Sequence, residues 1–523
     1  MRQYRNVLYG ILILGALAYT LWFVFAGFGN HQDPLYWLYK YETMQGGWMA
    51  AGTLLTGGLI VKLFGAQLLP LRLFGWLCVV AAILLPFFCL VPKEKRRDVY
   101  NWPILIVTFL LMGYGAFQEF SSGTLSVLLL SAIWVTAVTN HTSQILTAVL
   151  AGLAVTVRFP NILVLLILIP LWRKKCLLTI PVAALSAGAV YLLAYFFITP
   201  APLDAAMSSH DFVTMLTKLW TSGGKLAGYL LLSAGVVAIL SYIIHHTSNT
   251  LKSDVLRASV ALALGAAFVY FIVYTTKSVQ WYNIDLTYLL SALIIAITIY
   301  SYIIHKTSNI LIGVLLLSIT SLGTDTGWLK LFPAVLCLLP VALCAYEKHW
   351  RDGLLIILLC LATVTMWRMT TNSVGQSNLF HSSTRSSVAP YQGIAIRPVE
   401  QQFLNQYLAD YDSLQSPISN LQSPILALGQ EMHLMRAVTG CEAAKFNEFW
   451  SNIYDSVYTA KYRAIIQAEH PIVFCSYTPQ FKTKKEYKDR ESRMENMLRE
   501  EGYEAIDRSK YRYMIYIPQC ENE

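Results

Sequence analysis

Charged residues are scarce in this 523-residue chain, in which Asp, Glu, Lys and Arg make up only 13% while hydrophobic residues make up 56%. Soluble domains carry about a quarter charged residues, so this deficit indicates that a lipid bilayer solvates much of the chain. The deficit is uneven, because 16 of the 39 Lys and Arg residues lie after residue 370. The sequence therefore predicts a membrane part followed by a tail of ordinary composition.

Motifs for nucleotide binding and for common hydrolytic sites are also absent. No P-loop, GxGxxG, GxSxG or HExxH pattern occurs in the appropriate context, and no CxxC or Cys/His metal spacing is present. The basic residues of the membrane part lie in short clusters between apolar runs, where they orient helices, so the net charge of +9 does not indicate nucleic acid as a partner. Outside the cytoplasm there is no supply of nucleotide sugars or ATP, so an activated substrate used there would have to be lipid-borne.

Apolar runs long enough, or nearly long enough, to cross a bilayer recur along the first 370 residues. We predict an all-α polytopic bundle of about thirteen transmembrane helices, surrounded by membrane lipids, with its N-terminus in the cytoplasm. The runs are Val7–Phe28, Leu71–Leu90, Trp102–Phe117, Leu125–Val138, Ile145–Val157, Ile162–Trp172, Leu177–Ile198, Gly228–Ile244, Val255–Tyr274, Leu286–Ile304, Ile310–Leu322, Phe332–Tyr346 and Leu354–Met369.

Two segments decide whether the number of membrane crossings is odd or even. A crossing at Gly46–Gly65 would place the basic cluster at 93–97 outside the cytoplasm, against the positive-inside rule. We therefore predict that this segment is an interfacial helix within a first outer loop at 29–70. Treating Ile145–Trp172 as one helix would likewise place Arg173–Lys175 outside, so two short spans are predicted there. We therefore predict a multi-pass protein of a bacterial inner membrane, with its tail in the periplasm.

The composition changes after Met369. We predict three parts: a membrane domain at 1–370, a linker rich in Ser, Thr and Asn at 371–398, and a small extracytoplasmic α/β domain at 399–523. In the last part, PILALG, PIVFCSY and YRYMIYIP are predicted strands, and Tyr458–Glu469 and Lys485–Glu501 are predicted helices. Three cysteines of this domain can supply one disulfide outside the cytoplasm: Cys441, Cys475 and Cys520.

Carboxylates near the outer face are candidates for chemistry, because charges at a membrane are costly. Asp33 follows the first span in GNHQDPLYWLYKYETMQGGW. It could take a proton from an acceptor hydroxyl or hold a divalent metal beside a phosphate. Alternatively, it caps a helix beside an aromatic belt of Tyr36, Trp37 and Tyr39. Glu119, at the end of the third span, is either a second acidic site residue or a cap of the next helix.

Basic residues in the outer turns are candidates for binding a phosphate. Arg158 lies in TVRFPN, and its guanidinium suits bidentate recognition of a phosphate unless it snorkels to the interface. Arg72, at the start of the second span, either contacts a phosphate or has a structural role at the interface. Lys330 follows the GTDTGW turn, which either binds a polar headgroup or simply forms an Asx-type turn. Further candidates for contact with a sugar or a headgroup are Gln32, Tyr36, Trp281, Tyr282 and Asp325.

The order of these features resembles the GT-C class of membrane glycosyltransferases. A short cytoplasmic N-terminus, a long first outer loop with an Asp and an Arg that opens the second span match the pattern of this class. The general form is most similar to protein O-mannosyltransferases and lipid A aminoarabinose transferases. The resemblance covers nearly the whole chain and is carried by the spacing from QDPLYW through FGAQLLPLRLFGW to GLAVTVRFPNILVL.

The resemblance implies a transferase that moves a sugar from a polyprenyl-phosphate donor to a lipid, glycan or protein acceptor at the outer face. By position, Asp33 would be the catalytic carboxylate, acting as a base and contacting a metal such as Mg2+ or Mn2+ if one is used. Glu119 would be a second acidic site residue, and Arg158 would lie near the donor phosphate. This chain has Gln32 before Asp33, at a place where many relatives carry an acidic pair.

Two other classes of function remain as alternatives. A transporter or flippase of lipid-linked saccharides should show internal repeats and ionisable residues near the middle of the membrane. Here the charges gather at the outer ends, and the repeat is limited to the short match between SYIIHHTSNTL and SYIIHKTSNIL. A membrane-anchored assembly factor of the cell envelope would tolerate substitution of every outer carboxylate. The sequence favours the enzyme.

Overall fold

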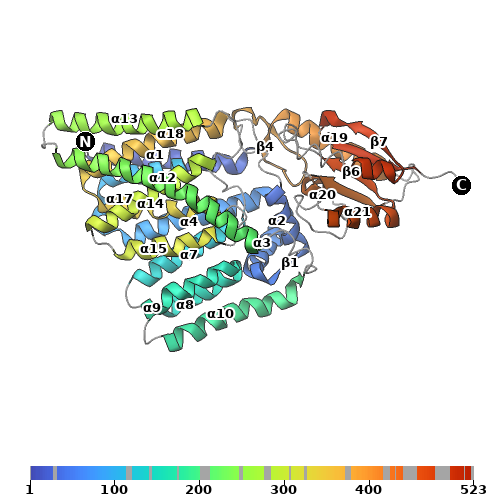
Figure 1. The fold of residues 1–523 in the computed structure, drawn as a ribbon, viewed down its shortest axis with the longest axis horizontal. Helices are drawn as coiled ribbons and strands as arrows, with labels where there is room; N and C mark the ends of the chain where they lie inside the picture. The colour runs from blue at the N-terminus through green and yellow to red at the C-terminus, as the bar shows by residue number, and fades with distance from the viewer. Residues whose placement is uncertain are drawn as a thin grey trace.

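The computed structural model describes residues 2–27, 32–113, 120–139, 144–172, 176–200, 212–246, 251–275, 284–305, 308–322, 327–371, 379–415, 424–429, 432–439, 456–476, 495–511 and 513–519. The chain forms a bundle of apolar helices and, at one end of it, a smaller C-terminal unit with a four-stranded sheet (Figure 1). The N-terminus lies at the end of the bundle away from this sheet.

Helical structure overlaps every predicted crossing. The helices are α1 (Arg2–Phe25), α4 (Leu68–Leu90), α6 (Trp102–Met112), α7 (Ser122–Val138), α8 (Gln144–Val157), α9 (Leu163–Trp172), α10 (Cys176–Phe197), α12 (Phe212–His246), α13 (Leu251–Thr275), α14 (Ile284–His305), α15 (Ser308–Ser318), α16 (Phe332–Leu336), α17 (Leu339–Ala345) and α18 (Lys348–Thr371). Within the described residues, 7 helices are long and apolar enough to cross a membrane, and further apolar helices are shorter. The chain is thus multi-pass, and the number of thirteen crossings stays a prediction.

The apolar run at 145–172 is interrupted, as predicted. Helix α8 ends at Val157, Arg158 has an extended backbone with φ −161° and ψ 124°, and the 3-10 turn η3 (Phe159–Ile162) leads into α9. Pro160 lies in this turn and has no backbone N–H to donate, which disfavours continuation of α8 through it.

The first loop, residues 29–70, contains two helices instead of the single one predicted. Helix α2 (Gln32–Thr43) is followed by β1 (Gln45–Gly46), the 3-10 turn η1 (Trp48–Ala50) and α3 (Ala51–Phe64). Both helices lie between the bundle and the C-terminal unit (Figure 1). With 14 residues, α3 is about 21 Å long, shorter than a bilayer core of about 30 Å. Strand β1 pairs in parallel with β2 (Thr199–Pro200), which follows α10.

The C-terminal unit is built on a sheet with the strand order β5-β6-β8-β7. Its strands are β5 (Ile425–Gly429), β6 (Ile472–Ser476), β7 (Tyr503–Arg508) and β8 (Tyr513–Pro518), and its helices include α19 (Pro398–Gln415), α20 (Met432–Thr439) and α21 (Ser456–Glu469). Only the β5–β6 pair is parallel. The three predicted strands coincide with β5, β6 and β8, whereas β7, at the sheet edge, was not predicted. Of the predicted helix at 485–501, the part up to residue 494 lies outside the described residues.

The predicted linker at 371–398 is packed from Leu379 onward and is not a free connection. It contains the turn η7 (Leu379–His381) and the antiparallel strands β3 (Thr384–Arg385) and β4 (Ala395–Ile396). Tyr391 and Ile394 have no exposed surface. The Ser/Thr-rich composition indicated a linker, but burial of the apolar side chains in VAPYQGIAI outweighs that tendency.

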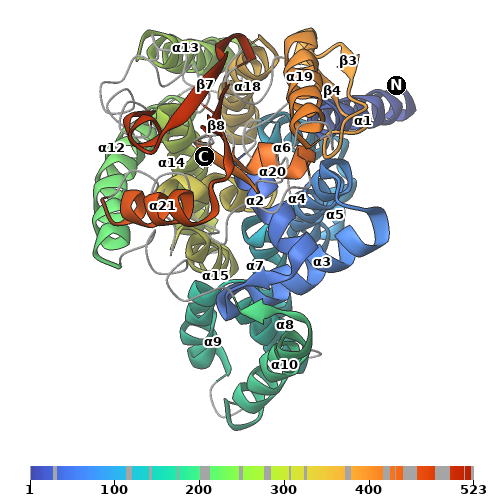
Figure 2. The ribbon, with the colours of Figure 1, turned by 90° about the vertical axis from the view of Figure 1, so that its right-hand side faces the viewer.

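Two hydrophobic clusters hold the molecule together. The bundle cluster consists of buried residues of the long helices, such as Ile83, Trp134 and Leu293. The junction cluster joins the first loop to the C-terminal unit, and it includes Leu35, Leu38, Tyr41, Tyr391, Ile394, Tyr407 and Phe474. The end-on view shows α2 next to α20 of the C-terminal unit (Figure 2). The first loop therefore shares its core with the last quarter of the chain.

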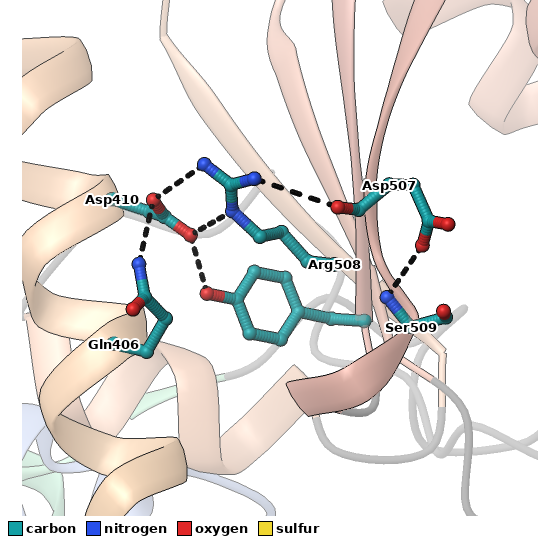
Figure 3. Close-up of polar contacts among 6 residues, drawn as sticks. Gln406, Asp410, Asp507, Arg508 and Ser509 are labelled. Carbon is teal, nitrogen blue, oxygen red and sulfur yellow. Dashed lines mark hydrogen bonds and ion pairs between the residues drawn. The ribbon is translucent and has the colours of Figure 1, made fainter.

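A buried carboxylate fastens α19 to the sheet (Figure 3). Asp410 accepts hydrogen bonds from Nε of Arg508 at 2.7 Å, from the hydroxyl of Tyr513 at 2.6 Å and from Nε2 of Gln406 at 3.1 Å. Burial by itself would raise the pKa of Asp410, but these hydrogen bonds and the charge of Arg508 lower it below its ordinary value. All of its oxygens point to groups of the same unit, so this network is structural.

Candidate functional site

The helix that carries Asp33 is fixed beside the segment that follows Glu119. Gln32 and Asp33 form the first turn of α2, and their side chains lie outside the described part of the chain, as does all of Glu119. The hydroxyl of Tyr41, also in α2, donates to the carbonyl of Phe120 at 2.9 Å. Gly57 of α3 permits this packing, because a Cβ there would lie 2.3 Å from the Tyr41 ring. Helix α2 therefore adjoins the chain at Phe120, and the structure places neither of the two carboxylates predicted for catalysis.

The turn at Arg158 joins the same region to a third segment. The hydroxyl of Thr53, in α3, donates to the carbonyl of Val157 at 3.0 Å. Arg158 donates through Nη1 to the carbonyl of Thr320 at 2.7 Å and through Nη2 to the carbonyl of Leu322. Thr320 belongs to the turn η5 (Ile319–Ser321), which precedes the turn η6 (Gly327–Leu331). Three segments distant in sequence thus meet at Arg158.

Arg158 remains a cation in this position. Desolvation lowers its pKa to about 10, which still leaves the guanidinium protonated at neutral pH. Within the described ranges it forms hydrogen bonds to carbonyl groups and no ion pair with a carboxylate. A guanidinium has five N–H donors, so those not used by Thr320 and Leu322 can bind an anion such as a phosphate.

Arg72 occupies a different place from the one expected of a residue that contacts phosphate directly. It is 1% exposed, and its Nη1 donates to the carbonyl of Gly27 at 2.9 Å. This bond fixes the chain shortly before α2 begins, so the position of Arg72 favours a role in orienting the first loop. Its predicted phosphate contact stays a prediction.

Lys330 is exposed and lies in η6, on the segment that accepts hydrogen bonds from Arg158. The backbone N–H of Trp328 in the same turn donates to Oγ of Ser222 in α12 at 3.3 Å, which anchors η6 to the bundle. Three other predicted site residues lie outside the described residues and are not placed by the structure: Trp281, Tyr282 and Asp325.

The described residues alone do not make up a metal site, since no group of three His, Cys, Asp or Glu side chains gathers within those ranges. We therefore derive no step through a metal, and the predicted use of Mg2+ or Mn2+ by Asp33 stays a prediction.

Lys40 is a candidate that was missed in the sequence. Its Nζ lies 4.1 Å from the centroid of the Tyr36 ring and 5.5 Å from that of Trp37. Desolvation lowers its pKa to about 8. Positions 33, 36, 37 and 40 recur at helical spacing along one face of α2, so the face that carries the Asp33 position also carries this cation. That spacing was visible in QDPLYWLYK and was the signal that could have identified Lys40.

The C-terminal unit holds the first loop at three places. Arg436 of α20 stacks on Tyr39 of α2, with Cζ 3.7 Å from the ring centroid. The backbone N–H of Gly27 donates to the carbonyl of Ala395 at 2.8 Å, before α2, and the N–H of Leu68 donates to the carbonyl of Pro390 at 3.0 Å, after α3. Both ends of the first loop are therefore tied to the tail. None of these contacts had a signal in the sequence, because the partners are hundreds of residues apart.

This end of the molecule thus combines a helix bearing a carboxylate position, aromatic rings and two desolvated cations, one on α2 and one in the turn that α3 contacts. Such a set can bind an anionic group, stack against a sugar ring and accept a proton.

Two solved structures are similar to this chain over nearly their full lengths. ArnT from Cupriavidus metallidurans in the apo state has 10% sequence identity and a TM-score of 0.44, with 98% of this chain and 97% of that chain covered. ArnT from the same organism bound to undecaprenyl phosphate has 11% identity and a TM-score of 0.43, with the same coverage. No family model and no curated protein matches the chain. At this level of similarity, neither an activity nor a ligand passes from ArnT to this chain.

Proposed function

We propose that this chain is a membrane glycosyltransferase that moves a sugar from a polyprenyl-phosphate donor to a lipid, glycan or protein acceptor. The observation that supports the proposal is the meeting of α3, the Arg158 turn and the η5–η6 segment at one end of the apolar bundle, with α2 packed against α3. A donor whose anchor is apolar and whose head is a phosphate sugar needs such a site, at the boundary between lipid and water.

In the proposed reaction, Asp33 accepts the proton of an acceptor hydroxyl while the hydroxyl oxygen attacks the anomeric carbon of the donor. The bond between that carbon and the phosphate oxygen breaks, and the polyprenyl phosphate leaves with the electron pair. Negative charge develops on the departing phosphate, and Arg158 and Lys40 are the described cations that can stabilise it. Glu119 is proposed as a second acidic residue of the site.

We also propose that the site faces the periplasm of a bacterial inner membrane and that the N-terminus is cytoplasmic. The hydrogen bond from Arg5 to the hydroxyl of Tyr100 places the basic segment at 93–97 near the N-terminus. The C-terminal unit lies at the other end of the bundle (Figure 1). With the basic end in the cytoplasm, the tail would be outside. A reporter fused after Met369 should be active only in the periplasm, and activity in the cytoplasm would reverse the assignment.

The test of the reaction is sugar transfer by the purified full chain in native-like lipid, with a panel of polyprenyl-phosphate sugars as donors. Asp33→Asn should abolish transfer while its thermal unfolding matches that of the parent. A folded variant with full activity would remove Asp33 from the mechanism.

Glu42→Gln, which removes another carboxylate of α2, is the matched control and should retain transfer. Addition of a chelator, followed by Mg2+ or Mn2+, tests the metal requirement in the same assay. If the parent transfers no sugar but moves labelled donor across the vesicle membrane, the flippase alternative replaces the transferase.

A further inference from the structure

Two cations converge on one exposed aromatic ring at the end of the bundle away from the C-terminal unit. Nη1 of Arg5 lies 2.7 Å from the hydroxyl of Tyr100, and Cζ of Arg5 lies 5.2 Å from the centroid of the Tyr100 ring. Nζ of Lys348 lies 5.5 Å from the same centroid. The three residues come from different elements, namely α1, the turn η2 (Val99–Asn101) and α18. Tyr100 is 45% exposed, so the arrangement is open to its surroundings.

Neighbouring polar groups bind within the protein and keep this end in place. Nζ of Lys95, in α5 (Lys93–Arg97), donates to the carbonyl of Cys344 at 2.7 Å. Arg351 donates to Oδ1 of Asn101, whose Nδ2 donates to the carbonyl of Lys95 at 2.6 Å. These bonds connect α5, η2 and α18 and therefore fix the position of Tyr100.

Lys95 and Arg351 donate to a backbone carbonyl and an amide oxygen, whereas Arg5 and Lys348 have no such acceptor within the described residues. Neither forms an ion pair with a carboxylate anywhere in the described ranges, although Asp98 lies close in sequence. The Oδ1 atom of Asp98 instead accepts the backbone N–H of Tyr100 at 3.1 Å. Two like charges near one ring repel each other, and an anion bound between them would reverse that repulsion.

The surroundings identify the class of anion. Apolar side chains one and two turns along α1 from Arg5 are exposed, among them Leu8, Ile11 and Leu12. In a multi-pass chain, a belt of exposed apolar residues lies against acyl chains, so Arg5 and Lys348 lie at the level of the headgroups. Basic sites between helices at this level bind the phosphates of anionic lipids.

We propose that Arg5, Tyr100 and Lys348 form a binding site for the phosphate of an anionic phospholipid headgroup. The two cations contact the phosphate oxygens, while the tyrosine ring fixes both cations and its hydroxyl lies beside them. The site is separate from the proposed transferase site and does not depend on that activity.

The experiment measures lipid binding to the purified full chain in detergent by native mass spectrometry, with cardiolipin and phosphatidylcholine as probes. The parent should bind cardiolipin preferentially. The double variant R5Q/K348Q should bind cardiolipin roughly tenfold more weakly, because two cations are removed from the phosphate. The matched control K93Q/R97Q also removes two charges, and both of its residues are exposed on the same end of the bundle, so it should bind within about twofold of the parent.

Three outcomes would overturn the proposal: an equal loss in both double variants, no loss in R5Q/K348Q, or displacement of cardiolipin by millimolar inorganic phosphate. The last result would assign the cations to free phosphate. The charge-preserving variant R5K/K348R keeps the test valid if R5Q/K348Q fails to fold, since it should retain cardiolipin binding and its failure to do so would contradict the proposed contacts.

Discussion

The bundle and the junction between first loop and tail differ in where their directional contacts lie. The bundle cluster is apolar and packs helices against one another. The junction adds backbone hydrogen bonds at Gly27 and Leu68 and a cation over Tyr39 to its apolar core, and within the C-terminal unit the buried Asp410 network joins α19 to the sheet. Hydrogen bonds also join helices within the bundle, such as the one from Ser131 of α7 to the carbonyl of Ala82 of α4, whereas the junction contacts reach the first loop from the tail and specify one position of α2. The comparison shows that the proposed site depends on the tail as much as on the bundle.

Among the tests of this comparison, the largest expected effect is at Arg158, which lies in the turn through which the bundle meets the first loop. Arg158→Glu should reduce sugar transfer about 100-fold or more, because the reversal places a negative charge beside the departing phosphate. Hydrogen exchange in the long helices should change little, since the described hydrogen bonds of the Arg158 side chain go to carbonyls of the turn at Thr320 and Leu322. Arg158→Lys keeps the charge but not the planar set of donors, so its rate of sugar transfer should lie between those of the parent and of Arg158→Glu. Normal turnover in Arg158→Glu would exclude this cation from the site.

The second prediction separates the stabilities of the two regions. Asp410→Asn should lower the opening free energy of α19 and the sheet by about 2–3 kcal/mol, because the charge is lost from the hydrogen bonds of Arg508 and Tyr513. Amide hydrogen exchange followed by mass spectrometry measures both regions in one sample. An equal loss of protection in the bundle would show that the two clusters unfold as one.

The same carboxylate should make the C-terminal unit more sensitive to acid than the bundle. Because the pKa of Asp410 is lower in the folded state, its contribution is fully present above the unfolded pKa of about 4. That contribution is lost as the pH falls through the folded pKa. The protection of the α19 amides, corrected for the intrinsic exchange rate at each pH, should fall between pH 6 and pH 3 more in the parent than in Asp410→Asn. Parallel curves for the two proteins would contradict the assignment.

Lys40 provides a smaller, pH-dependent effect on activity. Its pKa of about 8 means that the cation is present below that value and is lost above it. Transfer should therefore decline above about pH 8 in the parent but not in Lys40→Arg, whose guanidinium stays charged. Lys40→Met should be roughly tenfold less active at pH 7. If Lys40→Arg shows the same decline as the parent, another group is responsible for it.

The smallest expected effect is at Arg436. Arg436→Met should lower the free energy of opening of α2 by about 1 kcal/mol, because the cation over Tyr39 is lost. Exchange of the α2 amides should increase about fivefold, and transfer should fall through kcat more than through KM if the position of Asp33 changes. Arg463→Met, which removes a surface ion pair with Glu500 of the same unit, is the control and should leave α2 unchanged.

The helices of the bundle could be predicted because each is specified by its own residues. An apolar run long enough to require a bilayer is a local signal, and the break at Arg158 followed from Pro160 and from the position of the basic cluster after it. The strand β6 was predictable for the same reason, since IVFC is a continuous apolar run.

Much of the junction could not be predicted, because its partners are distant in sequence. The strand β7 has a mixed pattern, and pairing with β8 stabilises it at the sheet edge. Arg158 was selected from its sequence context, but its acceptors at Thr320 and Leu322 depend on the tertiary fold. The desolvation of Lys40 likewise arises from elements that pack around α2.

The junction also determines when, during synthesis of the chain, the first loop can reach its final packing. Gln67 and its hydrogen-bond partner Gln392 are 325 residues apart in sequence. Leu35 and Ile394, which belong to the same junction cluster, are further apart still. At synthesis rates of about 5–20 residues per second, roughly 15 to 65 seconds separate the two sides of this contact. During that interval α2 can pack on α3 and α4, but the part of its core that the tail supplies is missing. Insertion of the bundle can begin as its helices leave the ribosome, but the proposed site is completed only after the C-terminal unit has been synthesised.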